Sequence, residues 1–335
     1  MDFYFSSTPY HILLSFAVAR EHPDEQNILC VRSSSEGVAV LTRCIEKHPS
    51  SPFEEVYYLS NSYGQSTNKK RLLKAISAFK VLKIVREYDV KTIFVFNDIS
   101  GDVQMFLSLL RSNVDVAYIE DGSAAYNGSA RDWSTTEIIA RKVFFGPWWR
   151  RITVIGTGGY SDTIWTTHSE MTRHELSTLD HKQIPSENLL EDVGWIDQYL
   201  KEVWSLETVP KIESVVLLPH SSILQSDEYK QGTLENVIAT YNMNNTAIKY
   251  HPREEHESRF GFDPRFEIPQ SIPAEILYMK CGDLNKVIGD LSTSLLTAKW
   301  LRSDIDVISY GPAVGRFDQN LYDTFDQLGI TMKSE

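Results

Sequence analysis

The sequence predicts an α/β protein with two Rossmann-like domains, each built on a parallel, doubly wound sheet. Strand-like and helix-like segments alternate from the first residues, and they alternate again after an interruption around 161–210. Polar motifs follow several of the strands, at the edge where open α/β sheets bind ligands. A chain of 335 residues is also long enough to bury two separate cores.

The first half of the chain reads as a complete βα series. Short apolar runs predict strands at 3–5, 27–31, 55–59, 91–96 and 115–119. Segments of helical period predict helices at 10–20, 37–47, 69–88 and 101–111. Pro9 directly after a Ser/Thr run is a typical start signal for the first of these helices. One domain is therefore expected over 1–165.

A second βα series follows a connecting segment at 166–210, in which residues 191–204 have an amphipathic helical pattern. Its predicted strands are 214–218, 246–250, 286–288 and 307–310, and its helices are 232–241, 272–279 and 292–302. These elements predict a second domain over 211–317. The segment 318–335 begins with a helical pattern at 318–328, which in a two-domain arrangement could pack back on the first domain.

Composition limits the functional classes. The formal net charge of −12 argues against a nucleic-acid-binding protein, whose binding surface would be basic. Three widely spaced cysteines, Cys30, Cys44 and Cys281, form neither a disulfide framework nor a zinc pattern. The first residues lack the basic region of a signal peptide, and the apolar run at 12–19 is too short to span a bilayer. A cytoplasmic protein with reduced thiols is expected.

Three polar motifs follow predicted strands. His251-Pro252 closes the strand at 246–250, where proline ends the ladder and an imidazole meets the sheet edge. Glu120-Asp121-Gly122 closes the strand at 115–119 and offers a carboxylate as general base, with glycine allowing a tight turn. Taken alone, either motif is more often an ordinary structural turn than a site.

The third motif is Ser292-Thr293-Ser294, which opens the helix at 292–302. Hydroxyls and unpaired N–H groups at a helix N-terminus form an anion site suited to a phosphate. An ordinary N-cap is the alternative for any one of the three hydroxyls. Two domains in tandem, with candidate ligand groups at strand ends of both, predict a cleft between domains. This is the GT-B architecture of many glycosyltransferases.

In order and approximate spacing, these motifs resemble those of bacterial sialyltransferases: an acidic pair with Gly122, then His251-Pro252, then the Ser/Thr group. The opening Ser-Ser-Thr-Pro-Tyr-His at 6–11 also looks like the start of the lipooligosaccharide and capsule sialyltransferases. The resemblance spans most of the chain through short motifs. It implies an inverting transfer of sialic acid from CMP-sialic acid to a hydroxyl of a galactose or of another sialic acid.

The resemblance also implies roles for individual residues. Asp121 would be the general base on the acceptor side, with Glu120 as the alternative. His251 would donate to the phosphate of the departing CMP, and the hydroxyls of 292–294 would hold that phosphate. Glu275 lies where the family places a carboxylate on the nucleotide ribose, although a glutamate in the first turn of a helix is also stabilised by the helix dipole.

A second acidic candidate is Asp227, in the loop 219–228 that follows the first strand of the second domain. This loop would also face the cleft, so Asp227 is the alternative base. Ser221 and Ser222 in the same loop could contact the donor, or could simply be solvated. No metal is expected to be required, because a monophosphate leaving group can be stabilised by a histidine and neutral donors.

The segment 141–151 stands out in an acidic chain, since four large aromatic and four basic residues fall within it. Exposed, it would suit the inner face of the plasma membrane, with tryptophans at headgroup depth and cations on anionic lipid. Stacking of an acceptor glycan and ordinary core packing are the alternatives. A homodimer is possible on family grounds only.

Two other functions remain open at this stage. A GT-B transferase could use another donor, such as CMP-Kdo or a nucleoside diphosphate sugar, although no diphosphate-type Gly-rich loop is present. A two-domain binding protein could instead close on a small ligand without turnover. The linkage formed and the identity of the acceptor are not encoded in any recognisable pattern.

Overall fold

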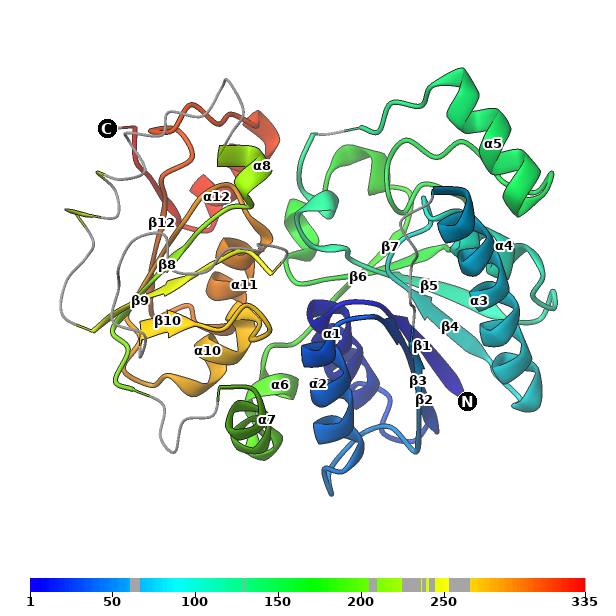
Figure 1. The fold of residues 1–335 in the computed structure, drawn as a ribbon, viewed down its shortest axis with the longest axis horizontal. Helices are drawn as coiled ribbons and strands as arrows, with labels where there is room; N and C mark the ends of the chain where they lie inside the picture. The colour runs from blue at the N-terminus through cyan, green and yellow to red at the C-terminus, as the bar shows by residue number, and fades with distance from the viewer. Residues whose placement is uncertain are drawn as a thin grey trace. The chain divides into compact units, whose positions relative to one another are not determined.

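The computed structural model describes residues 1–60, 67–128, 130–204, 210–224, 236, 239–240, 245–252 and 266–334. They belong to two compact units, Met1–Leu189 and Leu190–Glu335. Each unit is built on its own parallel sheet with helices packed against it (Figure 1). The α/β class with two Rossmann-like domains is therefore confirmed.

The first unit contains a seven-stranded sheet in the order β3-β2-β1-β4-β5-β6-β7. Its strands are β1 (Asp2–Ser6), β2 (Asn27–Ser33), β3 (Glu55–Ser60), β4 (Thr92–Val95), β5 (Asp115–Ile119), β6 (Thr163–Thr166) and β7 (Asp180–Gln183). All neighbouring strands are parallel, so all their carboxyl ends lie at one edge of the sheet. This edge carries the motif that follows β5.

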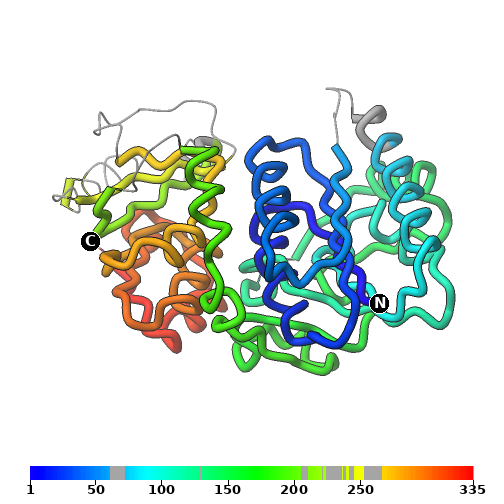
Figure 2. Tube along the Cα trace, turned by 90° about the horizontal axis from the view of Figure 1, so that it is seen from below, coloured from blue at the N-terminus to red at the C-terminus, as the bar shows by residue number. Residues whose placement is uncertain are grey.

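Helices cover both faces of this sheet (Figures 1 and 2). On one face lie α1 (Pro9–Arg20) and α2 (Glu36–Glu46); on the other lie α3 (Thr67–Glu87), α4 (Gly101–Ser108) and α5 (Thr135–Phe145). Successive side chains of β1 point to opposite faces of the sheet, so each face has its own apolar core beneath its helices. Phe3 and Phe5 belong to the core beneath α3, α4 and α5. Tyr4 points the other way and stacks on Phe94, with ring centroids 4.4 Å apart.

Three elements of the first unit have no counterpart among the predicted ones: α5, β6 and β7. The β6 and β7 sequences, TIWT and DHKQ, are short and largely polar, so they carry little strand signal. Because β7 pairs with β6, the first unit extends to Leu189, beyond the expected boundary at 165. The helix expected at 191–204 corresponds to α7 (Gly194–Trp204), and the short helix α6 (Glu187–Leu190) precedes it.

The second unit contains a six-stranded parallel sheet in the order β10-β9-β8-β11-β12-β13. Its strands are β8 (Ser214–Leu217), β9 (Thr246–Lys249), β10 (Glu267–Ile268), β11 (Lys286–Gly289), β12 (Asp306–Ser309) and β13 (Thr331–Met332). Its other helices are α8 (Ser221–Leu224), α10 (Ala274–Lys280), α11 (Thr293–Leu301) and α12 (Gln319–Gln327). Since β13 joins this sheet, the C-terminal segment belongs to the second unit. Most of the helix expected at 232–241 lies outside the described residues.

Within the part of the chain that the structure describes, no helix is long and apolar enough to cross a membrane.

Candidate active site

The carboxyl edge of the first sheet gathers polar side chains from four adjacent strands. Tyr10 and His11 follow β1, Asn97 follows β4, the Glu120-Asp121 pair follows β5, and Thr167 follows β6. In the sheet β1, β4, β5 and β6 are consecutive neighbours. Residues distant in sequence therefore meet at one edge, which is the ligand-binding edge of open α/β sheets.

Asp121 is held by two side chains, one on each carboxylate oxygen. His11 Nε2 lies 2.9 Å from Oδ1, and Asn97 Nδ2 donates to Oδ2 over 2.7 Å. Burial alone would raise the pKa of Asp121, but the charge on His11 and the hydrogen bonds from His11 and Asn97 together lower this pKa. The side chain keeps 28% of its surface exposed. Asp121 is thus an ionised, oriented carboxylate that solvent or a substrate can reach.

Glu120, its neighbour in sequence, is buried and fully occupied. Its carboxylate accepts hydrogen bonds from the Tyr10 and Tyr126 hydroxyls, and from both the backbone N–H and the hydroxyl of Thr167 at 2.9 Å. Burial raises the pKa of Glu120, and these hydrogen bonds oppose the rise. Successive residues at a strand end point to opposite sides. Glu120 therefore links the segments that contain Tyr10, Tyr126 and Thr167, whereas the Asp121 side chain is partly exposed to solvent.

Gly122 provides the turn that follows this pair. Its φ of +59° lies in the left-handed region, which side chains with a Cβ avoid. A short 3₁₀ turn, Gly122–Ala125, then carries the chain away from the sheet edge. The tight turn predicted from Asp-Gly is present.

His11 was not indicated as a site residue by the sequence patterns. Its ring stacks on Phe96, with centroids 4.0 Å apart and planes within 6°. Its backbone N–H donates to Thr8 Oγ1, so the helix cap fixes the residue in the first turn of α1. The position of a histidine just after a strand, at the start of a helix, is the signal that could have pointed to it.

In the second unit, two histidines lie side by side at the carboxyl edge. His251 follows β9 and His220 follows β8, and the two strands are paired. Their rings meet edge to face, with centroids 5.3 Å apart. The backbone N–H of Ser222 donates to His220 Nδ1 over 3.1 Å, so in the neutral ring the proton is on Nε2. His220 was not among the predicted site residues, although it follows its strand by three residues, much as His251 follows its own by two.

The predicted phosphate motif is the start of α11. Ser292 is the N-cap residue, but its side chain makes no capping hydrogen bond. Its Oγ is buried and has no hydrogen-bond partner within the described part of the chain. Thr293 and Ser294 are the first two helical residues, and the carbonyl of Ser294 accepts from the Tyr278 hydroxyl at 3.1 Å. The arrangement leaves a donor at a helix N-terminus, where an anion is favoured.

Glu275 lies on α10 and is buried, with its Oε1 accepting from the Thr297 hydroxyl at 3.2 Å. Burial raises the pKa of Glu275. The nearby Lys249, at the end of β9, is buried too, and its Nζ has no hydrogen-bond partner among the residues that the structure describes. Burial lowers the pKa of Lys249 to about 8, and the charge of Glu275 opposes this shift. Glu275, the predicted ribose ligand, is therefore part of a buried polar group with Thr297 and Lys249.

The other predicted candidates are placed as follows. Pro252 lies in an exposed turn directly after His251. Ser222 is exposed, and its hydroxyl lies 2.8 Å from His220 Nδ1. Ser221 begins α8, and its side chain lies outside the described residues, as does all of Asp227.

The aromatic and basic segment 141–151 is divided between the core and the surface. Phe145 and Trp149 are buried in the first unit's core. Val143 and Trp148 are exposed. The Gln104 side chain fixes the end of this segment through two hydrogen bonds to the backbone of Arg150. Its Nε2 donates to the Arg150 carbonyl, and its Oε1 accepts from the Arg150 N–H. Phe144 is partly buried and packs against the same core, so core packing is correct for three of the four aromatic residues.

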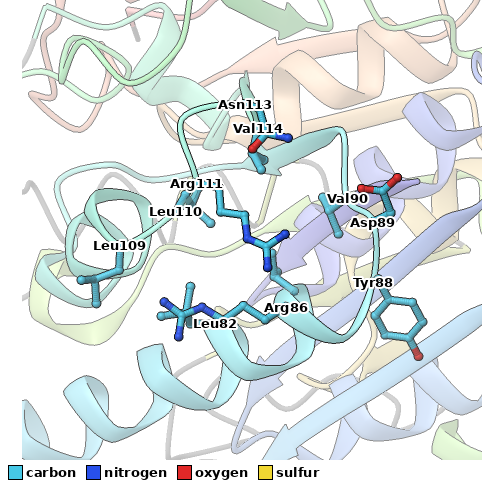
Figure 3. A pocket seen from close by; sticks show the side chains of 11 residues that line it. Leu82, Arg86, Tyr88, Asp89, Val90, Leu109, Leu110, Arg111, Asn113 and Val114 are labelled. Atoms are coloured by element: carbon cyan, nitrogen blue, oxygen red, sulfur yellow. The ribbon is translucent and has the colours of Figure 1, made fainter.

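One pocket of the first unit lies away from these motifs (Figure 3). It is lined by residues of the end of α3 and of the segments 88–90 and 109–114. These segments precede β4 and β5, so the pocket lies at the amino edge of the sheet, opposite Asp121. We place no active site there, because ligands of open α/β sheets bind at the carboxyl edge. Among the described residues, no group of three or more His, Cys, Asp or Glu side chains could hold a metal ion.

Comparison with known proteins identifies a family. The profile of glycosyltransferase family 52 matches residues 52–308, more than half of the chain. This range includes Asp121 and His251. No curated protein matches the chain.

Solved structures share the two-domain fold. The glycotransferase of kitacinnamycin matches 99% of this chain and 85% of its own, with 10% identity and a TM-score of 0.53. The UDP-GlcNAc 2-epimerase from Neisseria meningitidis, bound to UDP-GlcNAc, matches 100% and 95%, with 10% identity and a TM-score of 0.51. The UDP-GlcNAc 2-epimerase from Methanocaldococcus jannaschii matches 97% and 92%, with 13% identity and a TM-score of 0.50. At these identities the likeness shows the GT-B fold alone.

Proposed function

The chain belongs to glycosyltransferase family 52, the bacterial sialyltransferase family, and we propose that it moves sialic acid from CMP-sialic acid to a hydroxyl of a galactose- or sialic-acid-terminated glycan. The observation that carries this proposal is the pair of imidazoles at the carboxyl edge of the second sheet. Together with the hydroxyl-rich start of α11, they form a donor set suited to a phosphate. The lipooligosaccharide or capsule of a bacterium is the proposed source of the acceptor.

The proposed reaction is a single displacement with inversion. Asp121 takes the proton of the acceptor hydroxyl while the oxygen of that hydroxyl forms the new bond to the anomeric carbon of sialic acid. The bond from that carbon to the phosphate oxygen breaks, and CMP leaves with the bonding electrons. His251 donates a proton to the phosphate, and the negative charge is further stabilised by hydroxyl and N–H donors of 292–294.

Two features support Asp121 as the base in preference to Glu120. Each oxygen of Asp121 accepts one hydrogen bond from His11 or Asn97, which leaves a lone pair on each for a substrate proton. The carboxylate of Glu120, by contrast, already accepts four hydrogen bonds in a buried position. Asp227 remains the alternative base to be tested.

His220 supports the donor site as a second imidazole. Its Nδ1 accepts the N–H of Ser222, so its Nε2–H is available to a ligand. We assign it to the phosphate beside His251. No metal is part of the proposed reaction, since every step uses side chains of this chain.

The test is CMP release from CMP-sialic acid, with and without lactose, by the wild type and by single variants. Acceptor-stimulated release that is lost in Asp121→Ala and His251→Ala would support the donor and both roles. Asp115→Ala is the matched control, because Asp115 lies at the opposite end of the same strand and is exposed. Activity lost in Asp227→Ala and retained in Asp121→Ala would move the base to Asp227.

Calorimetry with CMP and with UDP separates the alternatives when wild-type release is absent. Binding of CMP would keep the sialyltransferase proposal and point to an untested acceptor. Preference for UDP would favour a nucleoside diphosphate sugar as donor. Binding of neither nucleotide would contradict the proposed donor.

A further inference from the structure

The carboxyl edge of the second sheet carries an arginine one strand beyond the proposed phosphate site. In this sheet β9, β8, β11 and β12 are consecutive neighbours. His251, His220 and Ser292 follow the first three of these strands. Arg316 lies in the segment between β12 and α12, and neighbouring strands are about 4.8 Å apart. The row of candidate ligand groups therefore continues from two imidazoles and a hydroxyl to a guanidinium.

Backbone contacts bring Arg316 back to the end of β12. Its N–H donates to the carbonyl of Gly311, just beyond the strand, over 2.9 Å. Gly315, with a φ of +84°, provides the left-handed residue in this turn. The carbonyl of Arg316 accepts from the hydroxyl of Tyr322 on α12. Arg316 is therefore held at the sheet edge through both its N–H and its carbonyl.

A buried carboxylate fixes the side chain of Arg316. Asp290 directly follows β11, and its Oδ1 accepts from the backbone N–H of Leu291 over 2.7 Å. Its Oδ2 lies 3.5 Å from Arg316 Nη1. Glycine at 311 permits this approach, because a Cβ there would meet the Leu291 side chain at 2.8 Å. Asp290 is buried, whereas 28% of the Arg316 side chain is exposed, so a ligand can reach the guanidinium.

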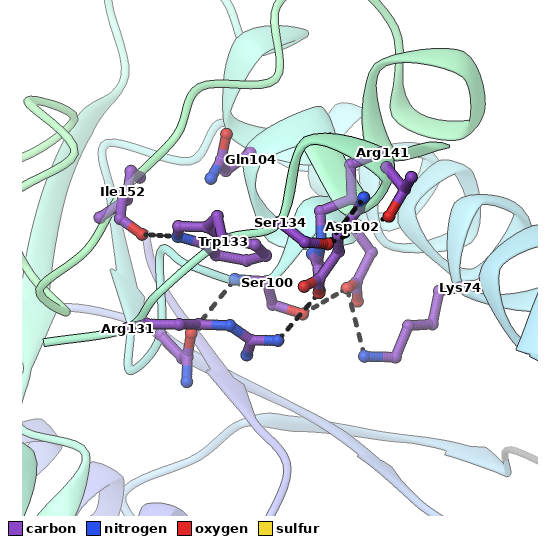
Figure 4. Close-up of polar contacts among 12 residues, drawn as sticks. Lys74, Ser100, Asp102, Gln104, Arg131, Trp133, Ser134, Arg141 and Ile152 are labelled. Carbon is purple, nitrogen blue, oxygen red and sulfur yellow. Dashed lines mark hydrogen bonds and ion pairs between the residues drawn. The ribbon is translucent and has the colours of Figure 1, made fainter. Parts of the chain in front are cut away.

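A buried ion pair of the first unit shows how a structural arginine is held. The fully buried carboxylate of Asp102 accepts from Arg32, and Lys74 Nζ lies 3.8 Å from its other oxygen (Figure 4). Burial would raise the pKa of Asp102, but the charges of Arg32 and Lys74 lower it overall. Only 7% of the Arg32 side chain is exposed. Burial keeps the pKa of Asp290 raised, with a single opposing charge, that of Arg316. The Arg316 pair is therefore looser and more open.

Arg316 has donors left for a ligand. A guanidinium presents several N–H groups in a planar fork that matches a carboxylate or a phosphate. Among the described residues, Asp290 is the one carboxylate within ion-pair distance of Arg316. Its distance of 3.5 Å is longer than the about 2.8 Å of a charge-assisted hydrogen bond. A planar anion at this edge would complete the coordination of the guanidinium.

We propose that Arg316 binds the carboxylate of the donor sugar and so selects a sugar with a carboxylate on its anomeric carbon, as sialic acid has. This inference rests on the proposed function. In CMP-sialic acid the carboxylate is attached to the same carbon as the phosphate oxygen, so it lies beside the phosphate. With the phosphate at the imidazoles and the start of α11, the adjacent strand supplies the partner of the carboxylate. A site built to pair with such a group discriminates against neutral sugars that lack it.

Calorimetry with the full chain and two donor analogues tests the proposal. The first is CMP-3-fluorosialic acid, whose fluorine slows the departure of CMP so that binding is measured without turnover. The second is the methyl ester of its carboxylate, which carries no negative charge at this position. The wild type is expected to bind the acid about tenfold more tightly than the ester, the difference expected for hydrogen bonds to a charged group. Arg316→Met should bind both analogues as the wild type binds the ester.

Two further variants and one further ligand serve as controls. Arg316→Lys restores the charge without the fork, so it should recover part of the preference for the acid. Lys211→Met removes an exposed cation that precedes β8 at the opposite, amino edge of the sheet, and it should keep the full preference. Binding of CMP by Arg316→Met shows that the second unit is folded and that its phosphate site is intact.

Three results would overturn the proposal. The first is equal affinity of the wild type for the acid and the ester while CMP binds. The second is a full preference for the acid in Arg316→Met, with a lower free energy of unfolding in urea, because Arg316 would then serve only to neutralise Asp290. The third is absence of CMP binding in the wild type, which would contradict the proposed donor itself and this inference with it.

Discussion

His11 Nε2 lies 2.9 Å from Asp121 Oδ1, although 110 residues separate the two in the chain. His11 lies in the first turn of α1, and Asp121 follows β5. The contact forms because β1 and β5 both flank β4 and end at the same edge of the sheet. A fixed imidazole beside a partly exposed carboxylate keeps that carboxylate ionised and oriented.

His11→Gln is expected to move the acid limb of the activity profile to higher pH. Burial raises the pKa of Asp121, and His11 is a main cause of its net lowering. Without His11 the pKa rises, so at any pH on the acid limb a smaller fraction of Asp121 is ionised and able to accept a proton. The measurement is kcat/KM against pH. His22→Gln is the control, since His22 pairs with Asp2 at the amino edge, 2.8 Å apart; an equal shift there would count against the role of His11.

Gly122→Ala should destabilise the protein by about 1–2 kcal/mol, because a Cβ is strained at its φ of +59°. Activity should fall as well, since the turn directs the preceding Asp121. Urea unfolding measures the free energy of unfolding. Gly282→Ala is the control, because a Cβ added there meets nothing within 4 Å. Unchanged stability in Gly122→Ala would contradict the left-handed turn.

His220→Asn should weaken CMP binding about tenfold, the loss expected for one hydrogen bond to a charged group. His251→Asn should weaken binding and also lower kcat, because it removes the proposed proton donor to the departing phosphate. Calorimetry and steady-state kinetics separate the two effects. His174→Asn changes an exposed histidine of the first unit and should alter neither quantity. Full CMP affinity in His220→Asn would exclude a direct contact with the phosphate.

Lys249→Met should make the protein more stable at neutral pH. Burial lowers the pKa of Lys249 to about 8 in the folded chain, from 10.5 in the unfolded chain. Between these values the unfolded state binds more protons, so wild-type stability rises with pH across pH 8–10.5. Below pH 8 the buried charge costs roughly 3 kcal/mol, and methionine removes this cost.

The measurement is the free energy of unfolding in urea at several pH values from 7 to about 10.5. The rise attributed to Lys249 should be absent in Lys249→Met and retained in Lys201→Met, whose lysine is exposed on α7. Parallel pH curves for the wild type and Lys249→Met would show that the amine has an ordinary pKa in the folded protein.

The local patterns of the chain were sufficient for most of the fold. The apolar run at 115–119 predicted β5 with the bounds that the structure has. The helices predicted at 10–20 and 37–47 correspond to α1 and α2, one residue earlier at their starts. The patterns failed for β6 and β7, because both are only four residues long and β7 is wholly polar; they form by pairing along the edge of an existing sheet.

The sequence by itself determined which residues follow strands, because hydrophobic periodicity and turn residues are local properties. It thereby placed Asp121 and His251 at sheet edges. It did not show which side chains contact Asp121 and which contact Glu120. The tertiary structure decided the different surroundings of the two carboxylates. The order of the strands brings Tyr10, Tyr126 and Thr167 onto Glu120, and brings His11 onto Asp121. Such pairings depend on which strands become neighbours, and no short segment of the chain contains that information.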